Sequence, residues 1–207
     1  MYPRQSASLL NSPHCQGRVA VRIGVLGTGV AGQTIGAALV ALGHDVMMGA
    51  RSADNEKALA FRDKTGGRTG TFADAAAFGE IVVHATRGDT ALAVLESVGA
   101  ANLAGKVLID ISNPLDFSNG YPPSLSVSNT DSLGEMIQRA FPEALVVKTL
   151  NTVTASVMVA PALVPGPHTV FVSGNDKGAK GRVMDLLRSF GWQSILDLGD
   201  ITTARGT

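Results

Sequence analysis

Short apolar runs rich in β-branched residues alternate with stretches of helical spacing along almost the whole chain. This alternation is typical of strands and helices that follow one another in a parallel sheet. Strands are predicted at 21–26, 45–49, 81–84, 107–111, 145–149, 169–172 and 194–198, with a weaker candidate at 68–71. Helices are predicted at 31–42, 54–64, 90–98, 132–140, 153–160 and 176–190. The pattern predicts an α/β fold with a doubly wound, mainly parallel sheet and helices on both faces.

Three segments depart from this alternation. Residues 1–18 carry Ser, Pro, Asn and Gln, and we expect a flexible leader before a single domain at 19–207. Residues 115–130, LDFSNGYPPSLSVSNT, have no periodicity and follow a predicted strand, at the sheet edge where open α/β sheets bind ligands. We expect this loop to face a ligand. The last residues, ITTARGT, read as the opening of a helix that is incomplete in this chain.

The segment GVLGTGVAGQTIGAAL, at 24–39, carries a glycine motif between the first predicted strand and helix. Residues 27–32 match G-x-G-x-x-G, the dinucleotide-binding fingerprint of the Rossmann fold. Its first glycine permits a tight turn, its second lets a pyrophosphate touch the backbone, and its third lets the helix approach the strand. The amides at the helix start then point at the phosphates. This context predicts a dinucleotide site, against the alternative of a packing turn without a ligand.

The end of the second strand indicates which dinucleotide binds. An NAD enzyme would carry an acidic residue there, whereas this chain has Gly49, Ala50, Arg51 and Ser52. The guanidinium of Arg51 and the hydroxyl of Ser52 suit a 2′-phosphate, and Thr28 could add a second hydroxyl. Alternatively, Arg51 is a solvated loop residue and Ser52 caps the next helix. We favour NADP over NAD.

Two later strand ends carry HATRGDT (84–90) and DISNP (110–114), which should border the pyrophosphate and the nicotinamide. Arg87 is predicted either to cover the adenine or a phosphate, or to be an exposed loop residue. His84 reads as a core histidine with satisfied hydrogen bonds. Asn113 offers an amide to a carboxamide or a ribose. The nucleotide is expected to contact Gly27, Thr28, Gly29, Val30, Ala31, Gly32, Arg51, Ser52, Ala85, Thr86, Arg87, Asn113 and Pro114.

The segment KTLNTV, at 148–153, follows a later strand and supplies the remaining candidates. Lys148 alternates with apolar neighbours, which favours a lysine that extends from a strand end to solvent. Asn151 and Thr152 are placed where a substrate would lie against the nicotinamide, although Thr152 could equally cap a helix. Together with Asn113, these two residues are the candidate catalytic groups, and their expected role is to position the reactants.

Composition excludes several classes of function. The chain has 17 basic and 17 acidic residues and only 5% aromatic residues, so we expect no nucleic-acid partner. No apolar run reaches membrane-spanning length and the first 18 residues lack the apolar core of a signal peptide, so we expect a cytoplasmic protein without a membrane partner. A single cysteine, Cys15, excludes an internal disulfide, and four scattered histidines predict no metal site.

The motifs GTGVAGQTIG, GARS, DISNP and KTLNTV stand in this order in the chain. With them the chain resembles the NADP oxidoreductase family dependent on coenzyme F420, and also the cytosolic reductase domain of membrane ferric reductases. The resemblance runs from about residue 21 to the end. It implies that Thr28, Arg51 and Ser52 hold the 2′-phosphate, that a deazaflavin stacks on the nicotinamide, and that the protein is a possible homodimer. Archaeal deazaflavin reductases tend to carry His in the position of Asn151, which leaves the acceptor open.

Three functions follow as alternatives. The first is hydride transfer between NADPH and a deazaflavin or flavin-like acceptor, which asks little acid–base chemistry of the protein. It fits a sequence without a Tyr-x-x-x-Lys pair and, as we predict, without a His/Asp couple at the strand ends. The second is reduction of a carbonyl, an imine or a ferric chelate, with Lys148 or a loop residue as the acid. The third is an NADP-binding sensor without catalysis, whose loop at 115–130 reports nucleotide state to a partner.

Overall fold

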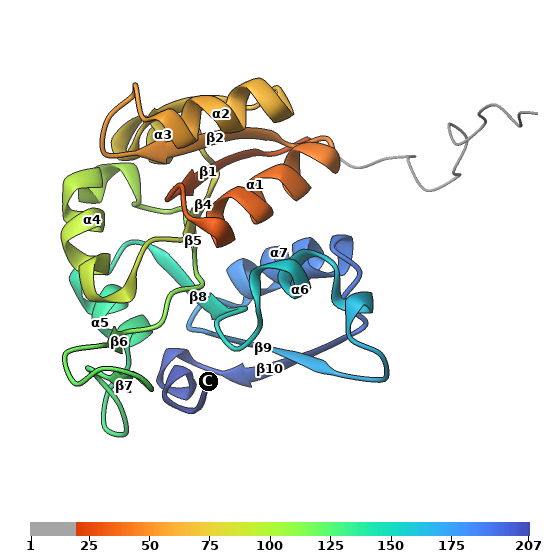
Figure 1. Cartoon of the computed structure of the whole chain (residues 1–207). Helices are drawn as coiled ribbons and strands as arrows, with labels where there is room; N and C mark the ends of the chain where they lie inside the picture. The colour runs from red at the N-terminus through yellow and green to blue at the C-terminus, as the bar shows by residue number, and fades with distance from the viewer. Residues whose placement is uncertain (1–19) are drawn as a thin grey trace, which may run out of the picture.

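The structure, a computed structural model, describes residues 20–207, so the predicted leader at 1–18 lies outside the described residues. Within the described part, eight strands form one twisted sheet in the order β3-β2-β1-β4-β5-β8-β9-β10 (Figure 1). The strands are β1 (Arg22–Leu26), β2 (Asp45–Ala50), β3 (Arg68–Thr71), β4 (Ile81–His84), β5 (Val107–Asp110), β8 (Leu145–Thr149), β9 (Thr169–Gly174) and β10 (Ser194–Gly199). All the predicted strands are present, including the weak candidate.

The sheet is parallel from β3 to β8, which confirms the predicted Rossmann-type α/β class. Strand β9 then runs antiparallel to β8, and β10 pairs in parallel with β9. Because the chain order reverses on either side of β1, the crevice at the carboxyl ends of β1 and β4 is the topological switch point where such sheets bind ligands. The glycine motif begins at the end of β1, directly at this crevice.

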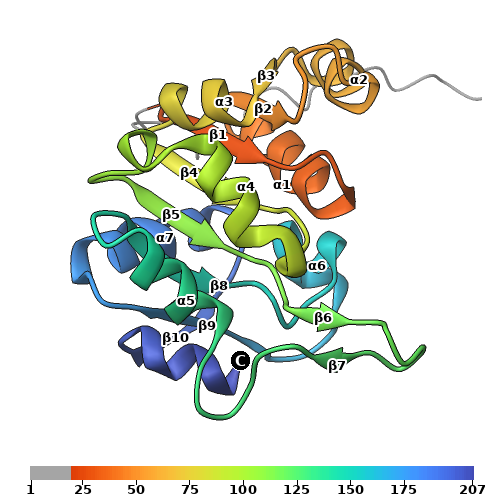
Figure 2. The ribbon, with the colours of Figure 1, turned by 90° about the vertical axis from the view of Figure 1, so that its left-hand side faces the viewer.

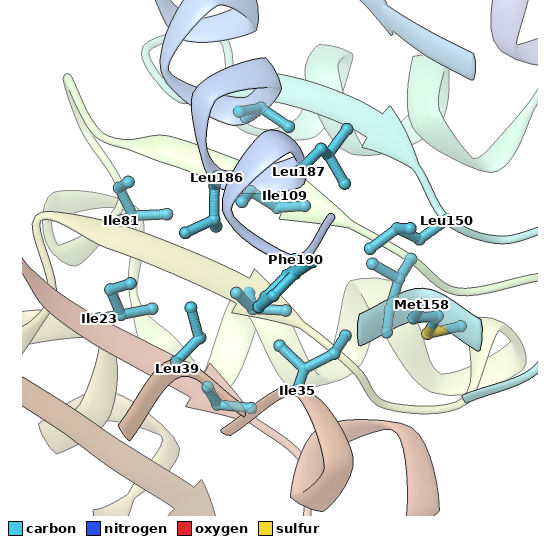
Figure 3. Close-up of a cluster of buried hydrophobic side chains, with 14 of the residues drawn as sticks. Ile23, Ile35, Leu39, Ile81, Ile109, Leu150, Met158, Leu186, Leu187 and Phe190 are labelled. Carbon is cyan, nitrogen blue, oxygen red and sulfur yellow. The ribbon is translucent and has the colours of Figure 1, made fainter. Parts of the chain in front are cut away.

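Helices cover both faces of the sheet (Figures 1 and 2). On one face, α1 (Val30–Ala41), α2 (Glu56–Thr65), α6 (Ala155–Val159) and α7 (Lys177–Ser189) pack over a core that includes Ile23, Leu39 and Phe190 (Figure 3). On the other face, α3 (Phe72–Phe78), α4 (Ala91–Val98) and α5 (Leu133–Ala140) pack over a second core. Both cores are built from alternating residues of the same strands, as expected for strands buried on both faces.

Helix α3 was not predicted from the sequence. Its start carries a capping box, in which the Thr71 hydroxyl accepts from the Asp74 amide and the Asp74 carboxylate accepts from Thr71. The helix lies very close to the sheet, since a Cβ on Gly24 would stand 2.1 Å from the Ala75 carbonyl oxygen. The glycine in β1 therefore makes room for α3.

Several local predictions were wrong. The helix predicted at 153–160 is the short α6, whose N-cap residue is Thr154, so Thr152 does not cap it. The segment predicted to lack structure contains two strands, β6 (Leu115–Asp116) and β7 (Ser124–Leu125), which form a hairpin that projects from the body of the molecule (Figure 2). The last turn, Ile201–Gly206, is a 3₁₀ helix. Among residues 20–207, no helix is both long enough and apolar enough to cross a membrane.

Candidate nucleotide-binding site

The turn between β1 and α1 needs its first and third glycines for reasons internal to the protein. Gly27 has φ +121°, a conformation that favours glycine, and a Cβ there would stand 2.5 Å from the Ala85 carbonyl oxygen. A Cβ on Gly32 would stand 2.1 Å from the Gly27 carbonyl oxygen. These two glycines therefore let the turn lie against the end of β4 and let α1 begin directly above it.

The second glycine has no such internal reason. Gly29 has φ −72° and ψ 179°, which any residue can adopt, and a Cβ there would meet no protein atom within 4 Å. Its open side faces a cleft at the carboxyl ends of the strands. Gly29 precedes the first turn of α1, where backbone N–H groups lack partners within the helix and carry partial positive charge. This arrangement leaves room for an anion against bare main chain.

The cleft beside this turn has a volume of about 280 Å³. It is lined by Gly27, Thr28, Gly29, Ala50, Arg51, Asn55, Phe72, Ala85, Thr86, Arg87, Thr90 and Val94. Seven of these residues are among the predicted nucleotide contacts. Of the others predicted, Val30, Ala31, Gly32 and Ser52 do not line the cleft, and Asn113 and Pro114 line neighbouring hollows.

Sequence reasoning missed Asn55 and Phe72 as cleft residues. The Asn55 side chain accepts a hydrogen bond from the Ala58 amide and caps α2, so Asn55, rather than Ser52, is the N-cap residue. Phe72 is the first residue of the unpredicted helix α3. Asn is one of the residue types preferred at helix N-caps, so the sequence did carry a signal that α2 begins after Asn55.

Arg51 is the cationic group at the outer end of the cleft. It is exposed on the turn after β2, and within the described chain it forms no ion pair or side-chain hydrogen bond. Ser52, also exposed, donates its hydroxyl to the Asp54 carboxylate. The guanidinium therefore keeps all its donors for a ligand at this end, whereas Ser52 shares its hydroxyl with an acidic neighbour.

A second hollow, of about 230 Å³, continues the cleft toward the β6–β7 hairpin. The two hollows share Thr86 and Arg87, and the second is also lined by Gly88, Asp89, Asn113, Leu115 and Phe117. Arg87 is exposed and pairs with Asp89, with 3.0 Å between Nε and Oδ1. The exposed, apolar Phe117 forms part of the outer wall. The two hollows therefore extend along the strand ends from Arg51 to this hairpin.

The structure brings two of the three candidate catalytic residues together. The Asn113 amide donates to the Asn151 carbonyl oxygen at 2.8 Å, and the Asn151 amide donates to Asn113 Oδ1 at 3.1 Å. Leu150, buried with φ +62°, makes the turn that precedes Asn151. Thr152 is exposed and lines neither hollow of the cleft. Of the two asparagines, Asn113 lines the second hollow, whereas Asn151 lines neither hollow of the cleft.

Two sequence predictions about charged groups were wrong. A His/Asp couple does stand at the strand ends, with His84 Nδ1 2.9 Å from Asp110 Oδ1. Lys148 does not extend to solvent, because it is 4% exposed and its Nζ lies 2.8 Å from Asp110 Oδ2. The register places these three residues side by side on one face of β4, β5 and β8. The prediction that His84 is a core histidine with satisfied hydrogen bonds is confirmed.

Asp110 is the anion at the centre of this buried row. Burial raises the pKa of its carboxyl, but the Lys148 ammonium and the hydrogen bond from His84 together hold that pKa below its ordinary range. The Ser112 amide and hydroxyl also donate to Asp110 Oδ1, at 3.1 and 2.6 Å. The carboxylate is therefore ionised and fully hydrogen-bonded, without access to the cleft.

No group of three or more His, Cys, Asp or Glu side chains in residues 20–207 could hold a metal ion. A larger hollow, of about 430 Å³, lies between the loop at 161–168 and residues 191–194, away from the glycine turn. The strand-end cleft combines a bare backbone turn, a helix start and an unpaired arginine, so the fold and the cleft have the features of a Rossmann-type dinucleotide-binding domain.

Comparison with known proteins gives the family. The model of the family "NADP oxidoreductase coenzyme F420-dependent" matches residues 22–114. The crystal structure of a candidate F420-dependent NADP reductase from Arthrobacter sp. FB24 is 52% identical, with a TM-score of 0.86, and the alignment covers 90% of this chain and 88% of that one. The chain belongs to this family, which places it among the NADP-dependent oxidoreductases.

Two curated relatives differ in what they are named to reduce. The F420-dependent NADP reductase of Methanocaldococcus jannaschii is 28% identical over 64% of this chain and 59% of its own length. The metalloreductase STEAP3 of Rattus norvegicus is 28% identical over 90% of this chain. The chain spans about a third of the length of that metalloreductase, 35%, so the match concerns one part of a larger protein.

Proposed function

We propose that the protein transfers hydride between NADP(H) and a flat heteroaromatic acceptor, a deazaflavin such as coenzyme F420 or a flavin. The observation that supports NADP(H) binding is Gly29. No contact within the protein requires a glycine at this position, and the absent Cβ leaves open space at the start of α1. A pyrophosphate against that backbone accounts for the glycine. The residues present therefore fit an NADP molecule, which supplies the hydride chemistry when bound.

The roles of the individual residues follow from their places along the cleft. The amides at the start of α1 hold the pyrophosphate, with Val30, Ala31 and Gly32 in the first helical turn. Arg51 binds the 2′-phosphate through its planar fork of donors. Thr28 adds a hydroxyl from the facing turn. Ser52 adds a second when its hydroxyl leaves the Asp54 carboxylate, to which it donates in the structure. Arg87 contributes positive charge where the two hollows meet.

The acceptor lies in the second hollow, between Asn113 and the β6–β7 hairpin. The apolar side chains of Leu115 and Phe117 suit a flat ring, and Asn113 positions the nicotinamide or its ribose. The nearest buried acid–base groups, His84 and Lys148, are both engaged by Asp110. The site therefore supplies orientation and exclusion of water rather than a proton donor, as hydride transfer between two rings requires.

We expect Arg51→Ala to weaken NADPH binding by about 1.5–3 kcal/mol, because a charge-assisted hydrogen bond to the 2′-phosphate is lost. NADH, which lacks that phosphate, should bind almost unchanged. Titration of the purified variant with both nucleotides, followed by fluorescence, measures the difference.

The matched control is Arg87→Ala, which removes an exposed arginine from the same cleft, away from the end of β2. This change should affect NADPH and NADH to a similar extent. An equal loss of both nucleotides in Arg51→Ala would show that Arg51 does not bind the 2′-phosphate.

The acceptor is tested by turnover. We expect the protein to oxidise NADPH with coenzyme F420 or a free flavin and to show no activity with simple ketones or imines. Absorbance at the NADPH and deazaflavin bands follows the reaction. Turnover with carbonyl compounds alone would contradict the proposal, and nucleotide binding without turnover on any acceptor would favour a sensor.

Reduction of a metal chelate is the second candidate function, and one observation favours it. The match to the rat metalloreductase extends over 90% of this chain, including the segment that follows the glycine motif. A ferric chelate in the same assay, with and without added flavin, tests it. Ferric reduction that needs the flavin would make the flavin the direct acceptor.

We also propose a cytoplasmic location and a homodimer. The location rests on the proposed use of NADPH, an intracellular cofactor, and the homodimer on the resemblance to dimeric relatives. Light scattering coupled to gel filtration measures the assembly, and a monomer at micromolar concentration would contradict the dimer.

A further inference from the structure

Thr86 connects the cleft to the buried charged row. The residue lines both hollows, at the point where they meet, so it stands near the middle of any molecule that lies across the strand ends. Its hydroxyl oxygen also lies 2.6 Å from His84 Nε2. His84 is 0% exposed and reaches Asp110 with its other nitrogen. Thr86 is therefore a cleft residue whose hydroxyl is hydrogen-bonded to the buried imidazole of His84.

The buried charges decide which atom of this pair donates. The ionised Asp110 can only accept, so His84 Nδ1 carries a hydrogen and donates to it. Lys148 already balances the charge of Asp110, and a protonated His84 would add a second cation to a fully buried carboxylate. In the tautomer that donates from Nδ1 to Asp110 and carries one ring hydrogen, Nε2 is an acceptor. The Thr86 hydroxyl must then donate its hydrogen to Nε2.

The consequence is that Thr86 presents lone pairs to the cleft and no hydrogen. A hydroxyl normally rotates to suit its partner, but the orientation of this one is fixed by its hydrogen bond to His84, which is itself bonded to Asp110. A phosphate oxygen, itself an acceptor, gains nothing from such a group. We propose that Thr86 accepts a hydrogen bond from the nicotinamide half of the dinucleotide, and that His84 is a positioning residue that fixes this polarity. The inference rests on the proposed binding of NADPH.

Two donors on that half have the required chemistry: the amide N–H of the nicotinamide carboxamide and a ribose hydroxyl. Replacing Thr86 by valine keeps the shape of the side chain and removes the acceptor. We expect Thr86→Val to weaken NADPH binding about three- to tenfold, as for one hydrogen bond, while the binding of adenosine 2′,5′-bisphosphate stays unchanged.

The 3-acetylpyridine analogue of NADP, which lacks the amide N–H, separates the two donors. A loss of analogue binding in Thr86→Val as large as the loss for NADPH assigns the ribose, and no loss assigns the carboxamide. Unchanged NADPH affinity in Thr86→Val would overturn the inference while leaving the proposed function intact. Failure of the unmodified protein to bind NADPH would overturn the proposed function itself.

The role of His84 is tested with two amides of different length. Asn places its amide near the position of Nδ1 and keeps the bond to Asp110, whereas Gln reaches the position of Nε2 and can accept from Thr86. We expect His84→Asn to weaken NADPH about as much as Thr86→Val, and His84→Gln to bind within about twofold of the unmodified protein. The double variant, His84→Asn with Thr86→Val, should lose no more than either single change.

Ser173→Ala provides the control for a merely structural effect. Ser173 is buried beside Lys148 in the neighbouring strand β9, but its hydroxyl pairs with Thr203 and does not reach the cleft. This variant should lower the unfolding midpoint without changing the NADPH affinity. The proposed role of His84 would be wrong if His84→Asn and His84→Gln weakened NADPH equally, or if the double variant lost the product of the two single effects.

Discussion

Replacing Gly29 with valine is expected to weaken NADPH binding more than about 100-fold, which corresponds to about 2.7 kcal/mol, without lowering the unfolding temperature. The backbone at Gly29 already has a conformation that valine adopts, and a Cβ there would meet no protein atom within 4 Å. It would instead occupy the space in front of the first turn of α1. Nucleotide titration and thermal unfolding of the same sample measure the two effects.

Gly32→Ala is the matched control in the same motif. A Cβ at Gly32 would stand 2.1 Å from the Gly27 carbonyl oxygen, so this smaller change should lower the free energy of unfolding by about 3 kcal/mol. The two glycines thus separate a requirement of the ligand from a requirement of the fold. Normal NADPH affinity in Gly29→Val would mean that the turn is purely structural and that the nucleotide does not lie there.

Lys148→Met should produce the largest loss of stability among these substitutions. The change keeps the aliphatic bulk but leaves the Asp110 carboxylate buried without its cationic partner. Breaking a buried pair in this way costs about 3–5 kcal/mol in the free energy of unfolding. Urea denaturation of the two proteins at pH 7 measures the difference.

The control for Lys148→Met is Lys180→Met. Lys180 is also buried, but its partner Asp197 is 40% exposed and keeps its contact with water, so the expected loss is about 1 kcal/mol. Similar losses for the two lysines would contradict the view that the fully buried Asp110 depends on its cation more than the half-exposed Asp197 does.

The pH dependence of Lys148→Met has a definite sign. The folded-state pKa of Asp110 lies below its unfolded value, so its contribution to stability is present above about pH 4 and is lost as the pH falls toward the folded pKa. Without Lys148, burial raises that pKa, and the variant then folds with a protonated carboxyl in acid. The stability difference between the two proteins should therefore begin to shrink as the pH falls through the raised pKa of the variant, and should shrink further below about pH 4. A difference independent of pH would show that Asp110 is not the group affected.

The sequence predicted most strands well because each is a short apolar run between polar segments, whereas β3, with the sequence RTGT, is not apolar and was the weaker candidate. It predicted α3 poorly, since seven residues are too few for helical periodicity and the capping box of Thr71 and Asp74 was the remaining signal. The antiparallel direction of β9 has no signature in the residues of the strand itself. Direction is set by where the preceding connection returns the chain, which is a property of the assembled fold.

For the candidate site, the glycine motif at 27–32 could be predicted from the sequence, but the buried cluster of His84, Asp110 and Lys148 could not. The glycine turn is contained in six consecutive residues, whereas Asp110 lies 26 positions from His84 and 38 from Lys148. A weak signal was nevertheless present. The runs IVVH, VLID and LVVK each end in an ionisable residue after three apolar ones. Because adjacent parallel strands end at the same edge, three such runs predict a buried charged cluster.

The β6–β7 hairpin forms a sheet of its own and contributes no residue to the hollow at the glycine turn. It contributes Leu115 and Phe117 to the far hollow, and Arg51 and the glycine turn belong to other segments of the chain. With the acceptor in the second hollow, as proposed above, changes in this hairpin would alter which molecule is reduced while the electron source stays the same. Related proteins with this fold could then act on different acceptors while the glycine turn and Arg51 stay the same.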